Sequence, residues 1–260
     1  MAEVIIERTP QAASARAARH IAATIAARPD LVLGVATGST PAHLYRELAR
    51  IRDRDGLDVS RLTVFALDEY VGLPAGHPES YAEVVRREVT DALGLDPSRV
   101  HVPDGSAADP FAAADEYEQR MEAAGGVDVQ ILGIGGNGHI GFNEPGSSLR
   151  SRTRVKTLSR STRTANARFF DEVDRVPAHC ITQGVGTILD AGHLVLLAFG
   201  AGKADAVAAA LEGPVTASVP GSALQLHPHV TALLDDPAAA ALAHREYYDD
   251  AWSLKPADVL

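Results

Sequence analysis

The sequence predicts an α/β fold in which a doubly wound, mostly parallel, Rossmann-like sheet carries helices on both faces. Short apolar runs alternate along the chain with longer helical patterns. The runs are nearly continuous in apolar residues, which is typical of strands buried on both faces. Four polar loops directly follow such runs, and open α/β sheets bind their ligands at that edge. These three observations together predict the fold class.

The strands and helices are expected in strict alternation. The predicted strands are Val4–Ile6, Leu31–Val35, Leu62–Leu67, Val127–Leu132, Leu194–Phe199 and Val230–Leu234. The predicted helices are Gln11–Ala27, Ala42–Arg52, Ser80–Leu93, Pro110–Ala124, Lys203–Leu211 and Ala238–Tyr248. Residues 146–190, rich in Arg, Ser and Thr, interrupt this order, and we expect them to form a lid or an interface element. No repeat or linker divides the chain, so residues 1–260 are expected to form a single domain.

The composition excludes several classes of protein. The formal net charge of −10 argues against a general nucleic-acid or acidic-membrane surface. A single cysteine, Cys180, rules out an internal disulfide and a cysteine-based zinc cluster and fits a reducing compartment. Neither a signal peptide nor an apolar stretch of membrane-spanning length is visible. We therefore expect a cytoplasmic protein.

The segment Gly133–Pro145, GIGGNGHIGFNEP, is the most informative part of the chain. Its five glycines favour neither a regular helix nor a strand, so it is expected to be a loop at the end of a strand. Gly133, Gly135 and Gly138 match a dinucleotide-binding pattern, but that pattern needs a helix at its third glycine and an acidic residue about twenty positions later. Neither is present, and no dinucleotide cofactor is predicted.

The same loop carries His139 and Glu144 together with Asn137. An imidazole titrates near neutral pH, and a nearby carboxylate can fix its tautomer, so the cluster predicts proton-transfer chemistry. A lone loop histidine is usually structural, but the clustering favours catalysis. No second His or Cys stands at ligand spacing, so no metal site is predicted. His227 and His229 are more simply residues of a polar loop.

Two other loops predict an anion site. Thr37-Gly38-Ser39-Thr40-Pro41 lies between a strand and a helix, with Thr40 expected to cap the helix and Pro41 to begin it. The alternative is a plain capped turn. Lys203 follows Gly200-Ala201-Gly202 at the start of another helix, where its charge opposes the helix dipole unless an anion lies between them. Arg168 could close over the same anion, although a solvated lysine and arginine are the simpler interpretations.

Asp68-Glu69 ends the strand Leu62–Leu67. Partial desolvation there favours a carboxylate pKa high enough for a general base. Neighbouring side chains at a strand end point in opposite directions, so only one of the two should face the site, and we choose Asp68. The alternative is a loop aspartate that accepts backbone hydrogen bonds.

Several long motifs resemble the glucosamine-6-phosphate deaminase family. They are LDEYVGLP with HPESY, GIGGNGHIGFNEPGSSLRSRTRVKTL, TRTANARFF, GVGTILDA, GAGK and LQLH, in order from about Ala18 to His227. The resemblance implies conversion of glucosamine 6-phosphate and water to fructose 6-phosphate and ammonia, without an organic cofactor. It implies that Asp68 moves a proton between C2 and C1, and that His139 opens the ring with Glu144 and Asn137 orienting it. It places the substrate and its phosphate on Thr37, Gly38, Ser39, Thr40, Gly138, Arg168 and Lys203.

Two departures qualify the resemblance. Some members have aspartate where this chain has Asn137. Asparagine carries no negative charge, so the pKa of His139 should be lower here than beside an aspartate, and we expect activity to survive. Allosteric members bind N-acetylglucosamine 6-phosphate at a subunit interface, which Ser147, Arg154, Lys156 and Thr157 match. Tyr247 is the fifth candidate allosteric residue, but the segment before it looks shorter than in the allosteric members. Whether the protein is activated, and whether it forms a homo-oligomer, are therefore open questions. The alternatives are a 6-phosphogluconolactonase-like hydrolase and a non-catalytic sugar-phosphate sensor.

Overall fold

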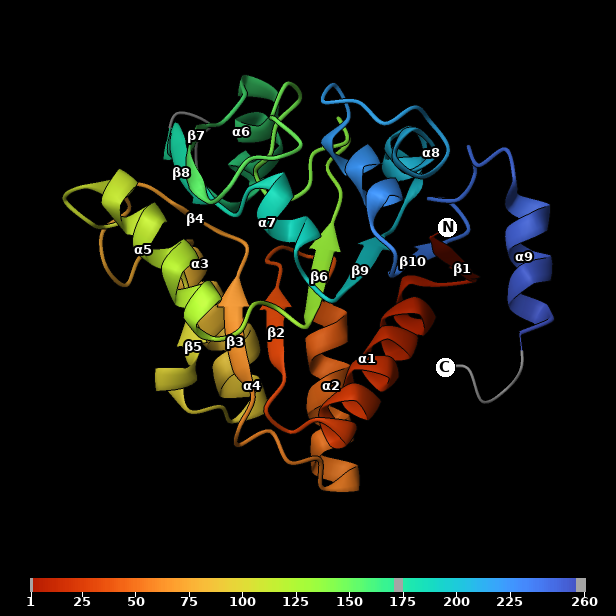
Figure 1. Ribbon diagram of the computed structural model, residues 1–260, viewed down its shortest axis with the longest axis horizontal. Helices are drawn as coiled ribbons and strands as arrows, with labels where there is room; N and C mark the ends of the chain where they lie inside the picture. The colour runs from red at the N-terminus through yellow and green to blue at the C-terminus, as the bar shows by residue number, and fades with distance from the viewer. Residues whose placement is uncertain (1, 171–174, 256–260) are drawn as a thin grey trace.

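The computed structural model describes residues 2–170 and 175–255, which contain a seven-stranded sheet in the order β1-β10-β9-β6-β2-β3-β5 (Figure 1). Every neighbouring pair in it is parallel, so the predicted α/β fold is confirmed. The strands are β1 (Glu3–Glu7), β2 (Val32–Val35), β3 (Thr63–Ala66), β5 (Val100–His101), β6 (Val129–Gly133), β9 (His193–Ala198) and β10 (Val230–Asp235). The two-residue β5 escaped prediction because it is too short for a pattern.

Helices cover both faces of this sheet because successive strand residues point to opposite sides. Leu33 and Val64 belong to the main core, against which α1 (Pro10–Ala27) and α2 (Ala42–Asp55) pack. Their neighbours Val32 and Phe65 contact Tyr117 and Met121 of α5 (Pro110–Ala123) instead. Alternate residues of these apolar strands therefore pack in two separate layers, one on each face of the sheet.

The remaining helical segments connect these layers. The predicted helix Ser80–Leu93 is three consecutive pieces, α3 (Tyr81–Val85), a π-helical turn η1 (Arg86–Thr90) and α4 (Asp91–Leu93). Later in the chain come α7 (Val185–Leu189), the 3₁₀ turn η5 (Ala201–Lys203), α8 (Ala204–Leu211) and η6 (Pro220–Leu226); η2 (Pro97–Arg99) precedes β5. No helix among the described residues is long and apolar enough to cross a membrane.

The last predicted helix, Ala238–Tyr248, is wrong in its position. The structure has turns from Asp236 onward and a helix α9 only at Arg245–Ser253. The Asp235 carboxylate accepts the Ala238 N–H (2.9 Å), which turns the chain directly after β10. Glu212 accepts the backbone N–H groups of Ala243 and His244, and α9 begins after them. Side chains distant in sequence therefore decide where this helix begins.

The insertion, residues 146–190, supplies two of the three strands of a second small sheet, which lies beyond the carboxyl edge of the large one (Figure 1). Its order is β4-β8-β7, all antiparallel, built from β4 (Asp68–Tyr70), β7 (Arg154–Thr157) and β8 (His179–Thr182). The short helix α6 (Arg160–Asn166) and the turn η3 (Ala167–Phe169) follow β7. Residues 171–174 of the predicted insertion lie outside the described residues.

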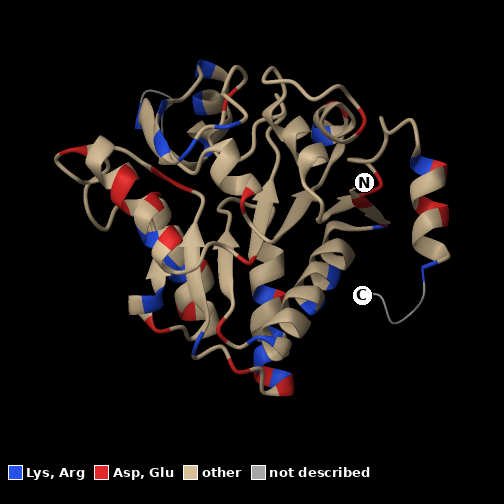
Figure 2. Cartoon of the chain, in the orientation of Figure 1, with Lys and Arg blue, Asp and Glu red and all other residues tan. Residues whose placement is uncertain are grey.

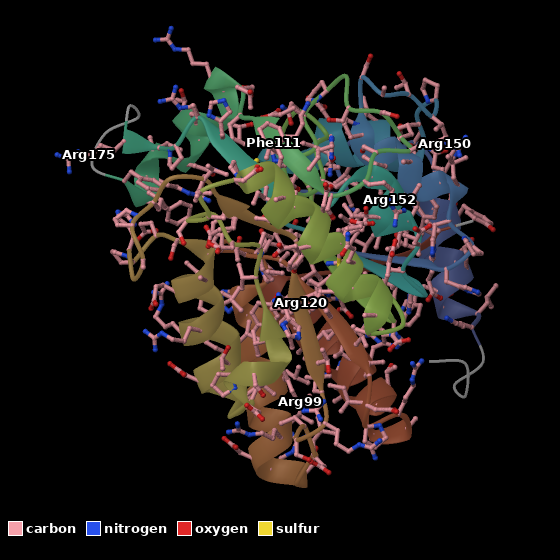
Figure 3. The ribbon with its side chains drawn as sticks, turned by 60° about the vertical axis from the view of Figure 1, so that its left-hand side comes forward. Arg99, Phe111, Arg120, Arg150, Arg152 and Arg175 are labelled. Carbon is pink, nitrogen blue, oxygen red and sulfur yellow. The ribbon has the colours of Figure 1, made fainter. Side chains whose placement is uncertain are left out.

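Charged contacts tie the insertion to the main layer. Arg152 lies beside α5 (Figure 3), where its guanidinium pairs with Glu118 of α5 and with Asp190. Glu118 also accepts the backbone N–H of Thr153 (3.1 Å) and the hydroxyl of Thr187. Lys and Arg residues are frequent on the insertion (Figure 2), although the chain as a whole is acidic.

Candidate active site

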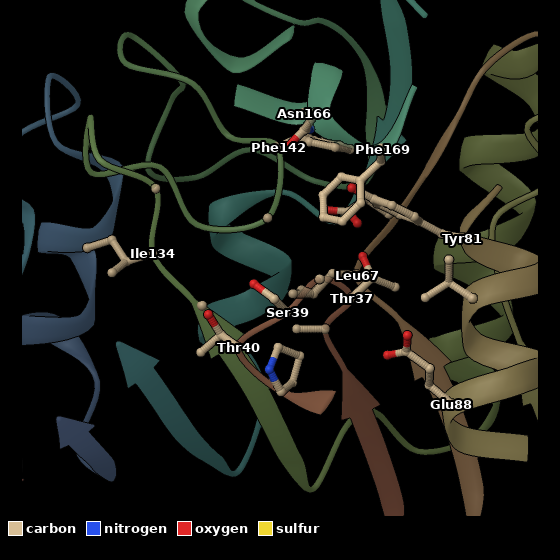
Figure 4. Close-up of a pocket in the computed structure, with 18 of the residues that line it drawn as sticks. Thr37, Ser39, Thr40, Leu67, Tyr81, Glu88, Ile134, Phe142, Asn166 and Phe169 are labelled. Atoms are coloured by element: carbon tan, nitrogen blue, oxygen red, sulfur yellow. The ribbon is translucent and has the colours of Figure 1, made fainter. Parts of the chain in front are cut away.

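A cavity of about 430 Å³ opens at the carboxyl edge of the large sheet, beneath the insertion (Figure 4). Its walls come from the segments that follow β2, β3, β6 and β9, together with α3, η1, α6 and η3. The predicted site residues that line it are Thr37, Gly38, Ser39, Thr40, Asp68, His139, Arg168 and Lys203. Four loops that are distant in sequence thus meet around one space.

The loop after β2 differs from the prediction in how it joins α2. That helix begins at Ala42 with Pro41 in the capping position, and no side chain caps it. The expected capping role of Thr40 is therefore wrong, because the Pro41 carbonyl already accepts the first helical bond from the Tyr45 N–H (3.1 Å). Thr40 instead lines the cavity beside Ser39, and Gly38 allows the turn with its φ of +99°.

Two of the cationic side chains that line the cavity, Lys203 and Arg168, come from separate segments. Lys203 lies at the start of α8, as predicted, where it occupies the capping position before Ala204. Burial, with the nearby charge of Arg168, lowers the pKa of Lys203. Arg168 belongs to η3, and its guanidinium lies 4.7 Å from the centre of the Phe169 ring. Both cations therefore lie at one cavity, whose lining also includes Arg87 and the carboxyl groups of Asp68, Glu79 and Glu88.

Asp68 and Glu69 lie side by side in β4 but face different surroundings. Glu69 accepts the backbone N–H groups of Tyr70 (2.7 Å), Tyr81 (2.9 Å) and Ala82 (2.8 Å), so it holds the start of α3. Asp68 lines the cavity and is buried. Burial raises the pKa of Asp68 to about 8, with a further contribution from the charge of Glu69. Of the two carboxylates, Asp68 therefore has the surroundings of a proton acceptor.

The loop after β6 brings together the three other predicted catalytic residues. Asn137 donates its amide N–H to Glu144 Oε2 (2.9 Å) and accepts the backbone N–H of His139 (3.2 Å). His139 Nδ1 lies 3.9 Å from Glu144 Oε2, too far for a hydrogen bond, and has no hydrogen-bond partner among the described residues. Burial lowers the pKa of His139, although the charge of Glu144 opposes this, so the imidazole is neutral at pH 7.

Two glycines of this loop have different roles. A Cβ at Gly135 would lie 2.2 Å from His139 Cε1, so a glycine is required for the imidazole to occupy its position. Gly138 has a φ of +83°, and its carbonyl accepts the Gly221 N–H. Gly138 packs against Val219 and does not line the cavity, in contrast to its predicted place among the substrate-binding residues.

Several residues of the cavity were missed from the sequence. Tyr81, Asn166 and Phe169 line it, and Phe169 and Asn166 lie on the insertion side, opposite Ser39 and Thr40 (Figure 4). Asn166 donates to the Tyr70 hydroxyl (2.9 Å), which links α6 to β4. Arg87 and Glu88 also line the cavity, from the π-helical turn η1. Only the motifs HPESY and TRTANARFF, which contain Tyr81 and Asn166, offered a signal.

The candidate allosteric residues do not form one site within the described chain. Arg154, Lys156 and Thr157 lie on β7. Ser147, which precedes this strand in the sequence, is buried, and its hydroxyl has no hydrogen-bond partner among the described residues. Tyr247 is exposed on α9, at the opposite side of the molecule from β7 (Figure 1). Among the described residues, no group of three or more His, Cys, Asp or Glu is arranged to hold a metal ion.

Comparison with known proteins gives a consistent result. The sequence model of the family described as glucosamine-6-phosphate isomerases/6-phosphogluconolactonase matches residues 7–233. The glucosamine-6-phosphate deaminase of Arthrobacter sp. strain FB24 is 56% identical over 255 residues, which cover 98% of each chain. That of Bifidobacterium longum strain DJO10A is 54% identical over 266 residues, covering 99% of this chain and 98% of the relative.

Solved structures agree with these sequence matches. A monomeric glucosamine-6-phosphate deaminase superimposes with a TM-score of 0.90 at 44% identity, covering 92% of this chain and 99% of that one. The 6-phosphogluconolactonase of Trypanosoma brucei has a TM-score of 0.75 at 22% identity over 94% of this chain and 99% of that one, which shows a shared fold only. The chain therefore belongs to the family of glucosamine-6-phosphate isomerases and 6-phosphogluconolactonases.

Proposed function

We propose that this protein converts glucosamine 6-phosphate and water to fructose 6-phosphate and ammonia in the cytoplasm. The observation that carries the proposal is the shared cavity, in which Asp68 and the neutral His139 lie with two cationic side chains, Arg168 and Lys203. This arrangement fits a phosphorylated sugar that must gain and lose protons at carbon and oxygen. The relatives at 54–56% identity carry the name of this activity.

Ring opening is the first chemical step that the proposal requires. The neutral imidazole of His139 accepts the proton of the C1 hydroxyl and delivers a proton to the ring oxygen as the bond from that oxygen to C1 breaks. The Glu144 carboxylate stabilises the imidazolium that forms between these two transfers, and Asn137 orients Glu144 through its amide (2.9 Å).

Isomerisation and deamination follow on the open chain. Asp68 removes the proton from C2 and returns one to C1 through an enolamine, which leaves a C2 imine. Water adds to C2 and ammonia departs, so that the ketone of fructose 6-phosphate forms. A carboxyl with a pKa of about 8 is basic enough to take part in such a transfer and acidic enough to return the proton.

The phosphate group binds at the loop after β2 in this proposal. Gly38, Ser39 and Thr40 would supply backbone and hydroxyl donors, while Arg168 and Lys203 supply charge. Burial of Lys203 strengthens its attraction to a dianion, because less water screens the pair.

The proposed reaction is tested by supplying two substrates to the purified protein. Ammonia release from glucosamine 6-phosphate, with no hydrolysis of 6-phosphogluconolactone above background, is the expected result. Lactone hydrolysis without ammonia release would favour the lactonase alternative. Tight binding of glucosamine 6-phosphate without any turnover would identify a sensor.

A homo-oligomer with allosteric control is the second part of the proposal. Ser147, Arg154, Lys156 and Thr157 carry donors and charge suited to a sugar phosphate, and the partner's Tyr247 would complete their site. The relative at 44% identity is described as monomeric, which instead supports a monomer. Light scattering, with kinetics in the presence of N-acetylglucosamine 6-phosphate, decides between them. A monomer with hyperbolic kinetics that the analogue leaves unchanged contradicts this part.

A further inference from the structure

Two segments of the candidate active site meet at one dipeptide, Thr182-Gln183, at the end of β8. One segment is the strand end that carries Asp68, and the other is the loop that carries His139. Both residues of the dipeptide are buried, with exposed fractions of 0% and 1%. A buried donor that loses its partner is costly, so hydrogen bonds in this place fix the groups that they join.

Three contacts hold the strand end that carries Asp68. Thr182 is the register partner of Asp68 in the antiparallel pair of β8 and β4, so the two side chains are neighbours on one face of the small sheet. The Gln183 backbone N–H donates to the Leu67 carbonyl (2.8 Å). The Gln183 side-chain amide donates to the Ala66 carbonyl (3.1 Å). The chain is therefore held where it leaves the large sheet and enters the small one.

The same dipeptide holds the loop that carries His139. The Phe142 N–H donates to Thr182 Oγ1 (3.1 Å). The hydroxyl in turn donates to the Gln183 carbonyl (3.2 Å), which fixes its direction. That carbonyl also accepts the side-chain amide of Asn143 (2.8 Å). Two consecutive residues of the loop are thus bound to two consecutive residues at the end of β8.

Gly141 shows how closely the two segments approach each other. A Cβ at this position would lie 3.0 Å from Thr182 Oγ1 and 3.4 Å from Asp68 Oδ2. The hydroxyl and the carboxylate therefore lie against the same point of the loop backbone. Gly141 has a φ of +51°, which a residue without a Cβ adopts readily. Thr182 thus holds the loop at the place where the Asp68 carboxylate adjoins it.

The proposed reaction needs these two segments in a fixed relation. His139 acts at C1 and the ring oxygen, whereas Asp68 acts at C2 and C1, so the two side chains serve neighbouring atoms of one sugar. An error of about 1 Å in the position of a catalytic group can slow a reaction by about a hundredfold. The contacts that fix Asp68 relative to the His139 loop therefore matter for the rate.

We propose that Thr182 is a positioning residue that sets the Asp68 carboxylate against the His139 loop. This inference rests on the proposed function, in which both side chains act on one substrate. Thr182 does not line the cavity, so it acts through the two segments and not on the substrate. Loss of its hydroxyl leaves the Phe142 N–H without this partner, and the loop shifts relative to Asp68.

The test compares Thr182→Val, which keeps the branched shape and removes the hydroxyl, with Thr182→Ser, which restores the hydroxyl. Substrate deuterated at C2 reports the step that is assigned to Asp68. In Thr182→Val, kcat should fall by about ten- to a hundredfold. The deuterium isotope effect on kcat should rise, because proton transfer from C2 becomes slow relative to the other steps.

Thr187→Val is the matched control. Thr187 is also a buried threonine with a hydrogen-bonded hydroxyl, which donates to Glu118 (3.1 Å), and it does not line the cavity. Thr187→Val and Thr182→Ser should keep the natural isotope effect, with kcat within about threefold of the natural value. KM should stay within about threefold in every variant, because the groups that bind the phosphate are untouched.

A second variant covers the case in which Thr182→Val does not fold. Gln183→Met removes the side-chain amide that holds the Ala66 carbonyl, while that carbonyl keeps the Tyr117 hydroxyl (2.7 Å) as a partner. It loosens the strand end that carries Asp68, so the isotope effect should rise in this variant too. Partial unfolding lowers kcat without changing the isotope effect, because the molecules that remain folded react normally.

The outcomes separate the inference from the function on which it rests. Ammonia release by the natural chain, with the same kcat and isotope effect in Thr182→Val, refutes the inference alone. A lower kcat with an unchanged isotope effect also refutes it, since the loss then lies outside the step assigned to Asp68. Absence of ammonia release from the natural chain refutes the proposed function, and this inference with it.

Discussion

The two ends of the large sheet both hold half-buried histidines, but these differ in their hydrogen bonding. At the amino end, His193 lies 3.3 Å from His20 through Nδ1 and 2.9 Å from the Thr231 hydroxyl through Nε2. At the carboxyl end, His139 Nδ1 is buried without a partner among the described residues, and the ring lines the cavity. Burial lowers the pKa of both. A lowered histidine pKa therefore does not by itself identify a site. His139 differs from His193 because it lines a cavity and its buried Nδ1 has no hydrogen-bond partner among the described residues.

The largest expected effect lies at the carboxyl end, in Asp68→Asn. We expect turnover to fall by about a thousandfold because the general base is lost, while binding of an unreactive phosphate ester stays nearly unchanged. In the natural chain, kcat/KM should fall about tenfold per pH unit below about 8, where Asp68 becomes protonated. Ammonia release across pH 6–9, with calorimetric binding, measures both. Near-normal turnover in the variant contradicts the mechanism.

The same variant should gain stability at high pH. The pKa of Asp68 is higher in the folded than in the unfolded chain, so the folded state binds the proton more tightly and stability falls as the pH rises from about 4 to about 8. Asp68→Asn removes this dependence. Urea unfolding at pH 8.5 should give the variant a larger free energy of unfolding than the natural chain. A lower value contradicts the assigned burial of the charge.

His139→Gln should reduce kcat by about a hundredfold with little change in KM, because proton transfer at the ring oxygen is lost. His193→Gln is the matched change at the other end of the sheet, and its kcat should stay within about twofold. Steady-state ammonia release measures both. Equal losses in the two variants would remove the distinction between the two ends.

Lys203→Gln should raise KM by about ten- to a hundredfold, since a buried charge–phosphate contact contributes about 1.5–3 kcal/mol. Lys255→Gln is the control, because Lys255 pairs with Glu3 far from the cavity. The KM of the Lys203 variant should also depend less on salt. An unchanged KM would show that the phosphate does not bind at the start of α8.

The smallest effect is expected in the pH dependence of stability at the amino end. The pKa of His193 falls to about 4, because burial and neighbouring histidines disfavour its charge, whereas in the unfolded chain it is near 6.5. The unfolded chain takes up the proton first, so stability is lost as the pH falls from about 6.5 to about 4. His193→Gln should lessen the drop in Tm between pH 7 and pH 5. An equal drop in Tm in the variant and in the natural chain would show that other groups cause the loss of stability at low pH.

Much of the fold was predictable because its strands are continuous apolar runs that no helix pattern imitates. The errors occur where distant groups compete for the backbone. Thr40 does not cap α2, and residues 238–244 are turns because Asp235 and Glu212 accept backbone N–H groups there. The small sheet of the insertion was also missed, since β4 and β7 pair only with β8 across long stretches of sequence.

The sequence by itself determined the parallel sheet, the loops at its carboxyl edge and the residue types available there for proton transfer. Strand periodicity is local, and the glycines that the His139 loop needs are visible in the sequence. Only the tertiary structure decided that Asp68 faces the cavity while Glu69 holds α3, that Gly138 packs against Val219, and that the backbone N–H of Ser159 binds Glu144. Burial and hydrogen bonding between distant segments set these outcomes, because the pKa and direction of a side chain depend on what packs around it.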